Sequence, residues 1–196
     1  MRTTNSIAAV RRGFTLVELL VVIAILTVLI GLLFPALIES NIKKNRLFCQ
    51  NNLRQLGICA RGYADDERFF PFAGCDAAPS EHLQVLINNS VKDTYVPDLF
   101  VCLGSSMEKK AQADQVTKEF VLTEKNVSYA WLAEESIPDA GASRILAADK
   151  TALNHAGSGI NVVYFGGNVQ FLKMENDNNW EEITGHQLTR GNTNTQ

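Results

Sequence analysis

Between Leu19 and Ile38 the sequence has no ionisable side chain. As a helix, these twenty positions would extend roughly 30 Å at about 1.5 Å per residue, which matches the hydrocarbon thickness of a bilayer. We therefore expect one helix that spans a membrane. An A-x-A triplet is also missing after the apolar run, where Pro35 is followed by Ala-Leu-Ile-Glu. Its absence excludes an ordinary secretory cleavage site.

The chain also lacks the motifs of common catalytic sites. Its three histidines, His82, His155 and His186, are scattered without an HExxH pattern, and no G-x-S-x-G, P-loop or Rossmann fingerprint is present. We expect no catalytic residues, no cofactor and no metal centre, and so no enzyme. Asp149 and His155 stand six positions apart in a glycine-rich stretch. We interpret them as turn-forming residues, with a metal ion between them as the minor alternative.

A basic composition is absent as well. The formal net charge is −3, and residues 1–13 carry three arginines and no acid, so the remaining chain stands near −6. We therefore do not expect nucleic-acid binding, which requires a basic surface. The 183 residues after position 13, less some 25 in a membrane, have the length of one small domain.

No CxxC pair occurs among the four cysteines, which argues against a four-cysteine zinc site. Cys49 and Cys59 lie ten positions apart on a predicted helix, about 15 Å along its axis, so they cannot pair. Cys75 and Cys102 flank a loop-rich segment and are the expected disulfide. Buried free thiols are the alternative, which we favour for Cys59.

One carboxylate stands at the start of the apolar run. Glu18 follows Gly13 by five residues, and Arg11 and Arg12 precede the glycine. A carboxylate near the centre of a membrane helix costs at least about 2.5 kcal/mol, so we interpret Glu18 as functional. A plain signal anchor is the simpler alternative, but it does not explain why Glu18 is tolerated.

Type IV pilin-like proteins, among them the pseudopilins of type II secretion, carry a signal that closely resembles the run Arg12-Gly13-Phe14-Thr15-Leu16-Val17-Glu18-Leu19-Leu20. The resemblance implies that prepilin peptidase removes a basic leader, residues 1–13, by cutting between Gly13 and Phe14, and that Phe14 is then methylated. It also implies that Glu18 acts in assembly and that Pro35 is the counterpart of the family's helix-kinking proline.

The same resemblance implies a structural subunit of a type IV pilus or of a type II secretion pseudopilus-like filament. The implied partners are prepilin peptidase, copies of itself or related pilins, an inner-membrane assembly platform and membrane lipid. The resemblance also places the N-terminus in the cytoplasm and the globular domain in the periplasm. The positive charges that flank the span are nearly balanced, so they do not decide its orientation. A tip or surface binding module on the same anchor is the alternative, and a tethered enzyme is a third class.

We expect the helix to continue from a transmembrane half, residues 14–38, into an amphipathic half, residues 39–64. Apolar or small side chains follow one helical face at Ile38, Ile42, Cys49, Leu53, Leu56, Ala60 and Tyr63. This stripe predicts that the second half packs on the domain. Asp65-Asp66 should end the helix near Tyr63, either as a solvated terminus or, with Glu67, as a calcium site of the kind known in related pseudopilins.

The following segment, residues 65–180, has the texture of a small antiparallel β domain, so the predicted fold class is α+β. A short helix is expected over Glu81–Asn88, capped by Ser80. Strands are expected over Leu99–Cys102, Phe120–Thr123, Ser128–Leu132 and Arg144–Ala148. The clearest signal is a hairpin of Asn161–Phe165 and Asn168–Leu172 with Gly166-Gly167 as a primed two-residue turn. We expect residues 181–196 to form a loose tail.

A further likeness lies beyond the signal. Residues 48–57 resemble the post-membrane helix of a large pilin-like subfamily whose terminal hairpin carries a histidine, nine residues and then Asp-Gly. Here ten residues separate His155 from the Gly166-Gly167 pair, and Gly166 replaces the aspartate. The resemblance at this point is therefore imperfect.

Overall fold

The computed structural model describes residues 14–89, 95–113, 119–132, 134, 141–174, 180–184 and 188–189. Gly13 and the rest of the expected leader lie outside the described residues. The chain divides into two compact units, residues 1–40 and 41–196, and each is described by itself.

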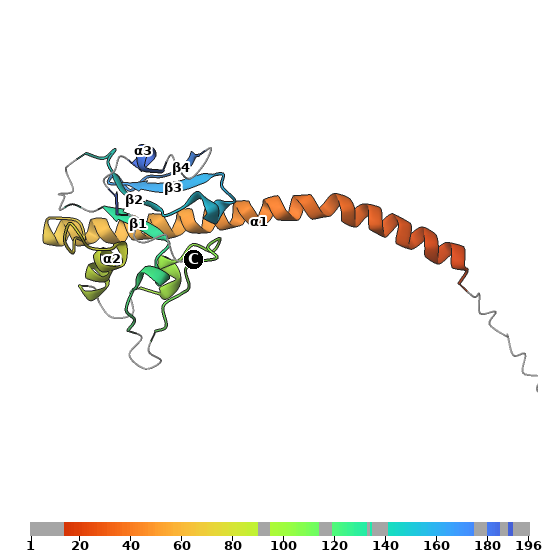
Figure 1. Cartoon of the computed structure of the whole chain (residues 1–196), viewed down its shortest axis with the longest axis horizontal. Helices are drawn as coiled ribbons and strands as arrows, with labels where there is room; N and C mark the ends of the chain where they lie inside the picture. The colour runs from red at the N-terminus through yellow and green to blue at the C-terminus, as the bar shows by residue number, and fades with distance from the viewer. Residues whose placement is uncertain are drawn as a thin grey trace, which may run out of the picture. The chain divides into compact units, whose positions relative to one another are not determined.

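The long helix expected from Phe14 to Tyr63 is present as α1 (Leu16–Glu67), coloured red to yellow in Figure 1. Within the first unit every side chain from position 14 to position 40 is exposed. In the part of the chain that the structure describes, α1 is the one helix long and apolar enough to cross a membrane. Pro35 lies inside α1, and its expected kink stays a prediction.

Within the second unit α1 is amphipathic, as its apolar stripe predicts. The side chains of Cys49, Leu53, Leu56 and Ala60 are fully buried, so the predicted packing face is confirmed. The helix does not end at Asp65-Asp66 but continues to Glu67. Asp65 accepts a hydrogen bond from Arg61 Nε at 3.1 Å, an i,i+4 pair that supports the last turn.

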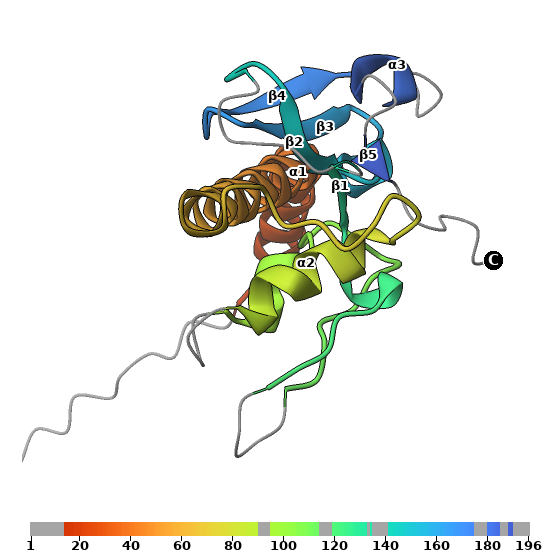
Figure 2. The same ribbon diagram turned by 90° about the vertical axis from the view of Figure 1, so that its left-hand side faces the viewer.

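Five antiparallel strands pack against this part of α1, which confirms the α+β fold. Their spatial order is β4-β3-β2-β1-β5. They are β1 (Tyr129–Leu132), β2 (Ile145–Asp149), β3 (Gly159–Tyr164), β4 (Val169–Lys173) and β5 (Leu188–Thr189). Figures 1 and 2 show α1 on one face of the sheet and the short helix α3 (Trp180–Thr184) on the other. Because both faces are covered, all the side chains of β3 are buried except that of Tyr164, which is half-buried.

The expected loose tail is corrected by α3 and β5. Trp180 is buried and donates a hydrogen bond from Nε1 to the Asp149 carbonyl oxygen at 2.8 Å. Leu188 pairs with Leu132 on β1. Two residues of strand are too short to give a sequence pattern, so β5 depends on pairing that the sequence does not display.

The predicted hairpin is confirmed as β3 and β4, but its turn is of another type. Gly167 N–H donates to the Tyr164 carbonyl at 2.8 Å, and Tyr164 N–H donates to the Asn168 carbonyl at 3.0 Å. Gly167 has a φ of 80°, whereas Gly166 is not in the left-handed region. This is a turn followed by one left-handed glycine rather than a primed two-residue turn.

Two predicted strands are wrong. Residues 97–100 form a short 3-10 helix, η1 (Pro97–Phe100), and residues 120–123 are irregular. In each place apolar side chains that suggested a strand are buried without strand pairing, as with Phe100 and Leu122. The N–H of Leu122 donates instead to the Gln84 side chain at 2.8 Å.

The short helix is confirmed as α2 (Pro79–Asn88), with a different cap. Its N-cap residue is Ala78, whose N–H donates to Glu81 Oε2 at 2.7 Å. Ser80 is buried inside the first turn and donates its N–H to Glu124 Oε1 at 3.0 Å.

Candidate functional site

The start of α1 is held by a reciprocal pair, Thr15 and Glu18. Thr15 donates to Glu18 Oε2 from its backbone N–H at 2.8 Å and from its hydroxyl at 2.9 Å. The N–H of Glu18 donates back to the Thr15 hydroxyl oxygen at 3.2 Å. A threonine followed three residues later by glutamate in this geometry is a capping box, which satisfies backbone donors at a helix N-terminus.

The capping box changes the interpretation of Glu18. Its carboxylate has local donors, so the charge is partly satisfied before any partner arrives. Both hydrogen bonds use Oε2, and no residue that the structure describes bonds Oε1. A plain signal anchor can therefore tolerate Glu18 more easily than the sequence alone suggests. The membrane cost of the charge no longer separates an anchor from an assembly segment.

Residues 19–38 of α1 offer an apolar surface on every side of the helix. Its exposed side chains include Leu19, Leu20, Ile23, Leu26 and Leu33. Fully burying one side chain of this size is worth about 1.5–3 kcal/mol relative to leaving it in water. The segment is therefore suited to lipid or to other apolar helices.

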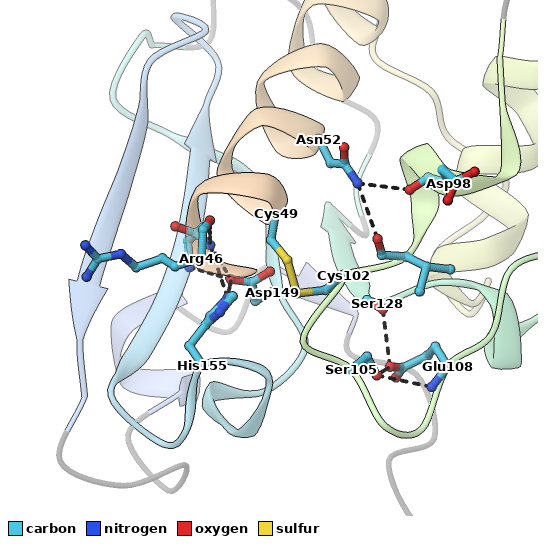
Figure 3. The surroundings of a disulfide bond; sticks show 12 residues. Arg46, Cys49, Asn52, Asp98, Cys102, Ser105, Glu108, Ser128, Asp149 and His155 are labelled. Carbon is cyan, nitrogen blue, oxygen red and sulfur yellow. Dashed lines mark hydrogen bonds and ion pairs between the residues drawn. A yellow bond between two sulfur atoms is a disulfide. The ribbon is translucent and has the colours of Figure 1, made fainter. Parts of the chain in front are cut away.

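A disulfide in the second unit joins Cys49 of α1 to Cys102, and this pairing corrects the expected one (Figure 3). Cys75 is exposed and free, and Cys59 is free, as expected, but half-buried rather than buried. Cys49 occupies the buried face of α1, where the chain after η1 passes. The position of Cys49 in the apolar stripe indicates from sequence that it is buried. That its disulfide partner is Cys102 follows only from the tertiary fold.

A buried polar cluster lies beside the disulfide. Asp149, at the end of β2, accepts three hydrogen bonds at Oδ2. The donors are Asn161 N–H at 2.6 Å, Asn161 Nδ2 at 2.9 Å and His155 Nε2 at 2.8 Å. His155 ends the 3-10 helix η3 (Ala152–His155), whose start is capped by the Thr151 hydroxyl.

This bonding pattern defines which ring nitrogen of His155 carries a proton. Since Nε2 faces a carboxylate oxygen, it is the protonated nitrogen, and the Asn161 amide at 3.1 Å from Nε2 directs its hydrogens to Asp149. Burial raises the pKa of the nearby Tyr129 hydroxyl well above its usual range, and the Asp149 charge adds to the shift. His155 lies in a turn, as the sequence suggested, whereas Asp149 ends β2, and both side chains are buried in the core.

The comparisons with known proteins concern the first unit. Residues 9–34 match the family described as the prokaryotic N-terminal methylation motif. Together with a long apolar helix that starts at Leu16, this match fits a type IV pilin-like protein. The chain carries a prokaryotic N-terminal methylation motif at residues 9–34. No curated protein and no solved structure matches the chain.

The expected processing residues, Gly13 and Phe14, and the expected assembly residue, Glu18, all lie within the matched segment. Phe14 and Glu18 lie at the described beginning of the chain, while Gly13 is outside it. The motif implies a substrate of prepilin peptidase that assembles with other pilins. The buried cluster around Asp149 lies outside the matched segment, and sequence spacing alone did not reveal it.

Proposed function

We propose that the chain is a structural subunit of a type IV pilus or a type II secretion pseudopilus-like filament. Prepilin peptidase cuts between Gly13 and Phe14, and the new N-terminal residue is methylated. The observation that carries the proposal is the match of residues 9–34 to the methylation motif, at the start of a helix whose residues 19–38 carry no ionisable side chain.

Before assembly, the chain is a single-pass inner-membrane protein with its N-terminus in the cytoplasm and its domain in the periplasm. On assembly, the apolar half of α1 leaves lipid for the core of a filament, where packing against neighbouring helices replaces contact with lipid. Head-to-tail contacts of this kind generate an open helical fibre.

Glu18 has a defined part in this scheme. The capping box occupies Oε2, which leaves Oε1 available. In the proposed filament, Oε1 pairs with the N-terminal ammonium of Phe14 on a neighbouring subunit. A charge pair in the apolar core neutralises two groups, and breaking it costs about 3–5 kcal/mol. The carboxylate therefore serves helix capping within one subunit and charge neutralisation between subunits.

The two roles of Glu18 are separable by substitution. Glu18→Gln keeps the capping box, because glutamine also serves at this position, but removes the charge. Glu18→Ala removes both, and Thr15→Ala removes the cap and leaves the charge. Cells are fractionated into membrane and sheared-filament pools, and the amount of each variant is compared with wild type by immunoblot.

We expect Glu18→Gln and Glu18→Ala to enter the membrane normally and to fall sharply in the filament pool. The amount of Thr15→Ala in the filament pool should fall less, since a missing helix cap costs about 1 kcal/mol. Recovery of Glu18→Gln at the wild-type level would show that the cap, not the charge, is what assembly uses. Absence of the wild type itself from the filament pool would contradict the proposed function.

A further inference from the structure

Four buried side chains of the second unit place metal-ligating atoms around one point. Cys49 and Cys102 each offer a sulfur, Asp149 a carboxylate oxygen and His155 a ring nitrogen, and these atoms all lie within 4.8 Å of one another. None of the four side chains is more than 1% exposed. They come from α1, the segment after η1, β2 and η3, which meet at the disulfide (Figure 3).

Two atoms of this cluster have no partner in the disulfide-bonded state. Asp149 Oδ1 and His155 Nδ1 are buried and make no hydrogen bond within the described residues. A buried polar atom left without a partner costs about 1–3 kcal/mol, and more when it is charged. The same two side chains bring ligand atoms within 4.8 Å of both sulfurs, which makes the cluster a candidate site for a ligand.

The donor set is that of a zinc-type site. Two thiolates, one imidazole and one carboxylate give Zn²⁺ the four ligands that it takes in tetrahedral sites, where ligand atoms lie roughly 3–4 Å apart. The four ligand atoms already lie within 4.8 Å of one another, and the two sulfurs move apart once their bond is broken. Asn161 already donates to Asp149 and would act as the supporting shell that orients a ligand.

The four ligands remain together without the disulfide, because other contacts hold the same segments. Asn52 of α1 donates from Nδ2 to the carbonyl oxygens of Asp98 at 3.0 Å and Val101 at 3.3 Å. Gly104 lies so close to Asn154 that an added Cβ would stand 2.0 Å from the Asn154 carbonyl oxygen. Cys102 is thereby held near α1 on one side and near η3 on the other.

We propose that the chain binds one zinc-like divalent ion through Cys49, Cys102, Asp149 and His155 when the disulfide is reduced. A dithiol reductant supplies two electrons and two protons, which break the S–S bond and leave two thiols, while the reductant becomes a disulfide. Metal binding then releases the two thiol protons, and His155 coordinates through Nε2, whose proton moves to the unpartnered Nδ1, so that Asp149 and His155 face the same ion. Reoxidation by a disulfide oxidant reforms the Cys49–Cys102 bond and expels the ion. The disulfide and the bound metal are therefore alternative links between α1 and the segment after η1.

This inference reverses the expectation that no metal is bound and is independent of the proposed filament function. Its test uses the full chain in detergent micelles on a Cys59→Ser/Cys75→Ser background, which leaves one cysteine pair. The chain is prepared oxidised, and also reduced with a phosphine that is then removed without oxygen. Co²⁺ is the probe, because cobalt bound to thiolates in a tetrahedral site has characteristic charge-transfer and visible bands.

We expect the reduced chain to bind one Co²⁺ with these bands and Zn²⁺ to displace it, whereas the oxidised chain shows neither. His155→Ala and Asp149→Asn should each weaken binding at least about tenfold. His82→Gln, a change at a buried histidine outside the cluster, should leave it unchanged. Near-ultraviolet circular dichroism of Trp131 and Trp180 shows whether each variant is folded.

A second measurement needs no variant at the site. Zn²⁺ should raise the unfolding temperature of the reduced chain and not that of the oxidised chain, since a ligand stabilises only the state that binds it. Three results would overturn the proposal: no stoichiometric Co²⁺ in the reduced chain, equal binding by the oxidised chain, or unchanged affinity in both His155→Ala and Asp149→Asn. The last would mean that two thiols alone hold the metal.

Discussion

Residues 19–38 of α1 are apolar on every side of the helix, whereas residues 39–67 carry apolar side chains on one face and charged ones on the other. The difference is visible in burial. Leu26 and Leu33 are exposed, while Leu53 and Leu56 are fully buried. One continuous helix thus contains two kinds of segment that differ in how much of their apolar surface is buried.

Both halves of α1 are helical but only the second is buried, so helix formation and burial are separate properties of this chain. The second half obtains its apolar partners from its own chain and needs nothing else. The first half has no such partners among the described residues, so its surface requires lipid or other helices. Substitutions that are alike in chemistry should therefore have unlike effects in the two halves.

The largest contrast is expected from leucine truncation. Leu53→Ala should lower the free energy of unfolding of the domain by about 2–5 kcal/mol, because Leu53 is fully buried. Leu26→Ala should leave it unchanged. Both are measured by urea unfolding of the full chain in micelles, followed by the fluorescence of Trp131 and Trp180. Equal effects of the two substitutions would show that the two halves of α1 contribute alike to the stability of the domain.

Glycine substitutions sharpen the description of the buried half. A Cβ on Gly57 would lie 2.8 Å from Val163 Cγ2, whereas one on Gly62 meets nothing within 4 Å. Gly57→Ala should therefore destabilise the domain by about 1–3 kcal/mol through overpacking. Gly62→Ala should stabilise it by up to about 1 kcal/mol through helix propensity. Opposite signs in the same unfolding assay are the expected result, and two stabilising substitutions would contradict the close packing of α1 on β3.

The smallest effect is a pH dependence confined to the second unit. Burial lowers the pKa of His82 below its usual 6.5, and its Nδ1 accepts a hydrogen bond from Ala73 N–H at 3.0 Å. Below about pH 6.5 the unfolded chain gains a proton that the folded chain resists, so stability falls as pH falls. The slope from this group is at most about 1.4 kcal/mol per pH unit.

The control for this pH effect is His82→Gln, which cannot titrate. It should flatten the dependence of the unfolding midpoint on pH between about 5 and 7. The helix content of residues 19–38, which lack ionisable groups, should not change over the same range. A slope that survives His82→Gln would assign the effect to another group.

Sequence reasoning succeeds where periodicity alone carries the information. The stripe through Leu53 and Leu56 predicts the packing face of α1, and alternation predicts β3 and β4. It fails where long-range proximity decides. Phe100 and Leu122 resemble strand residues because they are buried, yet they have no strand neighbours.

The candidate sites divide in the same way. Glu18 is predictable because its motif is contiguous, although its hydrogen bonds to Thr15 emerge only from the structure. The pairing of Cys49 with Cys102 depends on where the chain after η1 crosses α1. The contacts of Asp149 and His155 likewise depend on strand register, which spacing along the chain does not encode.

The proposal that the first half of α1 is a processed pilin-type segment is tested by the start of the mature chain and by the modification of its amine. The protein is isolated from its native membrane, and the intact mass and the N-terminal peptide are measured by mass spectrometry. We predict a chain that begins at Phe14 and carries one methyl group on its amine. Gly13→Leu should retain the leader and the unmethylated start. A wild-type chain that begins at Met1, or beyond residue 34, would contradict the account.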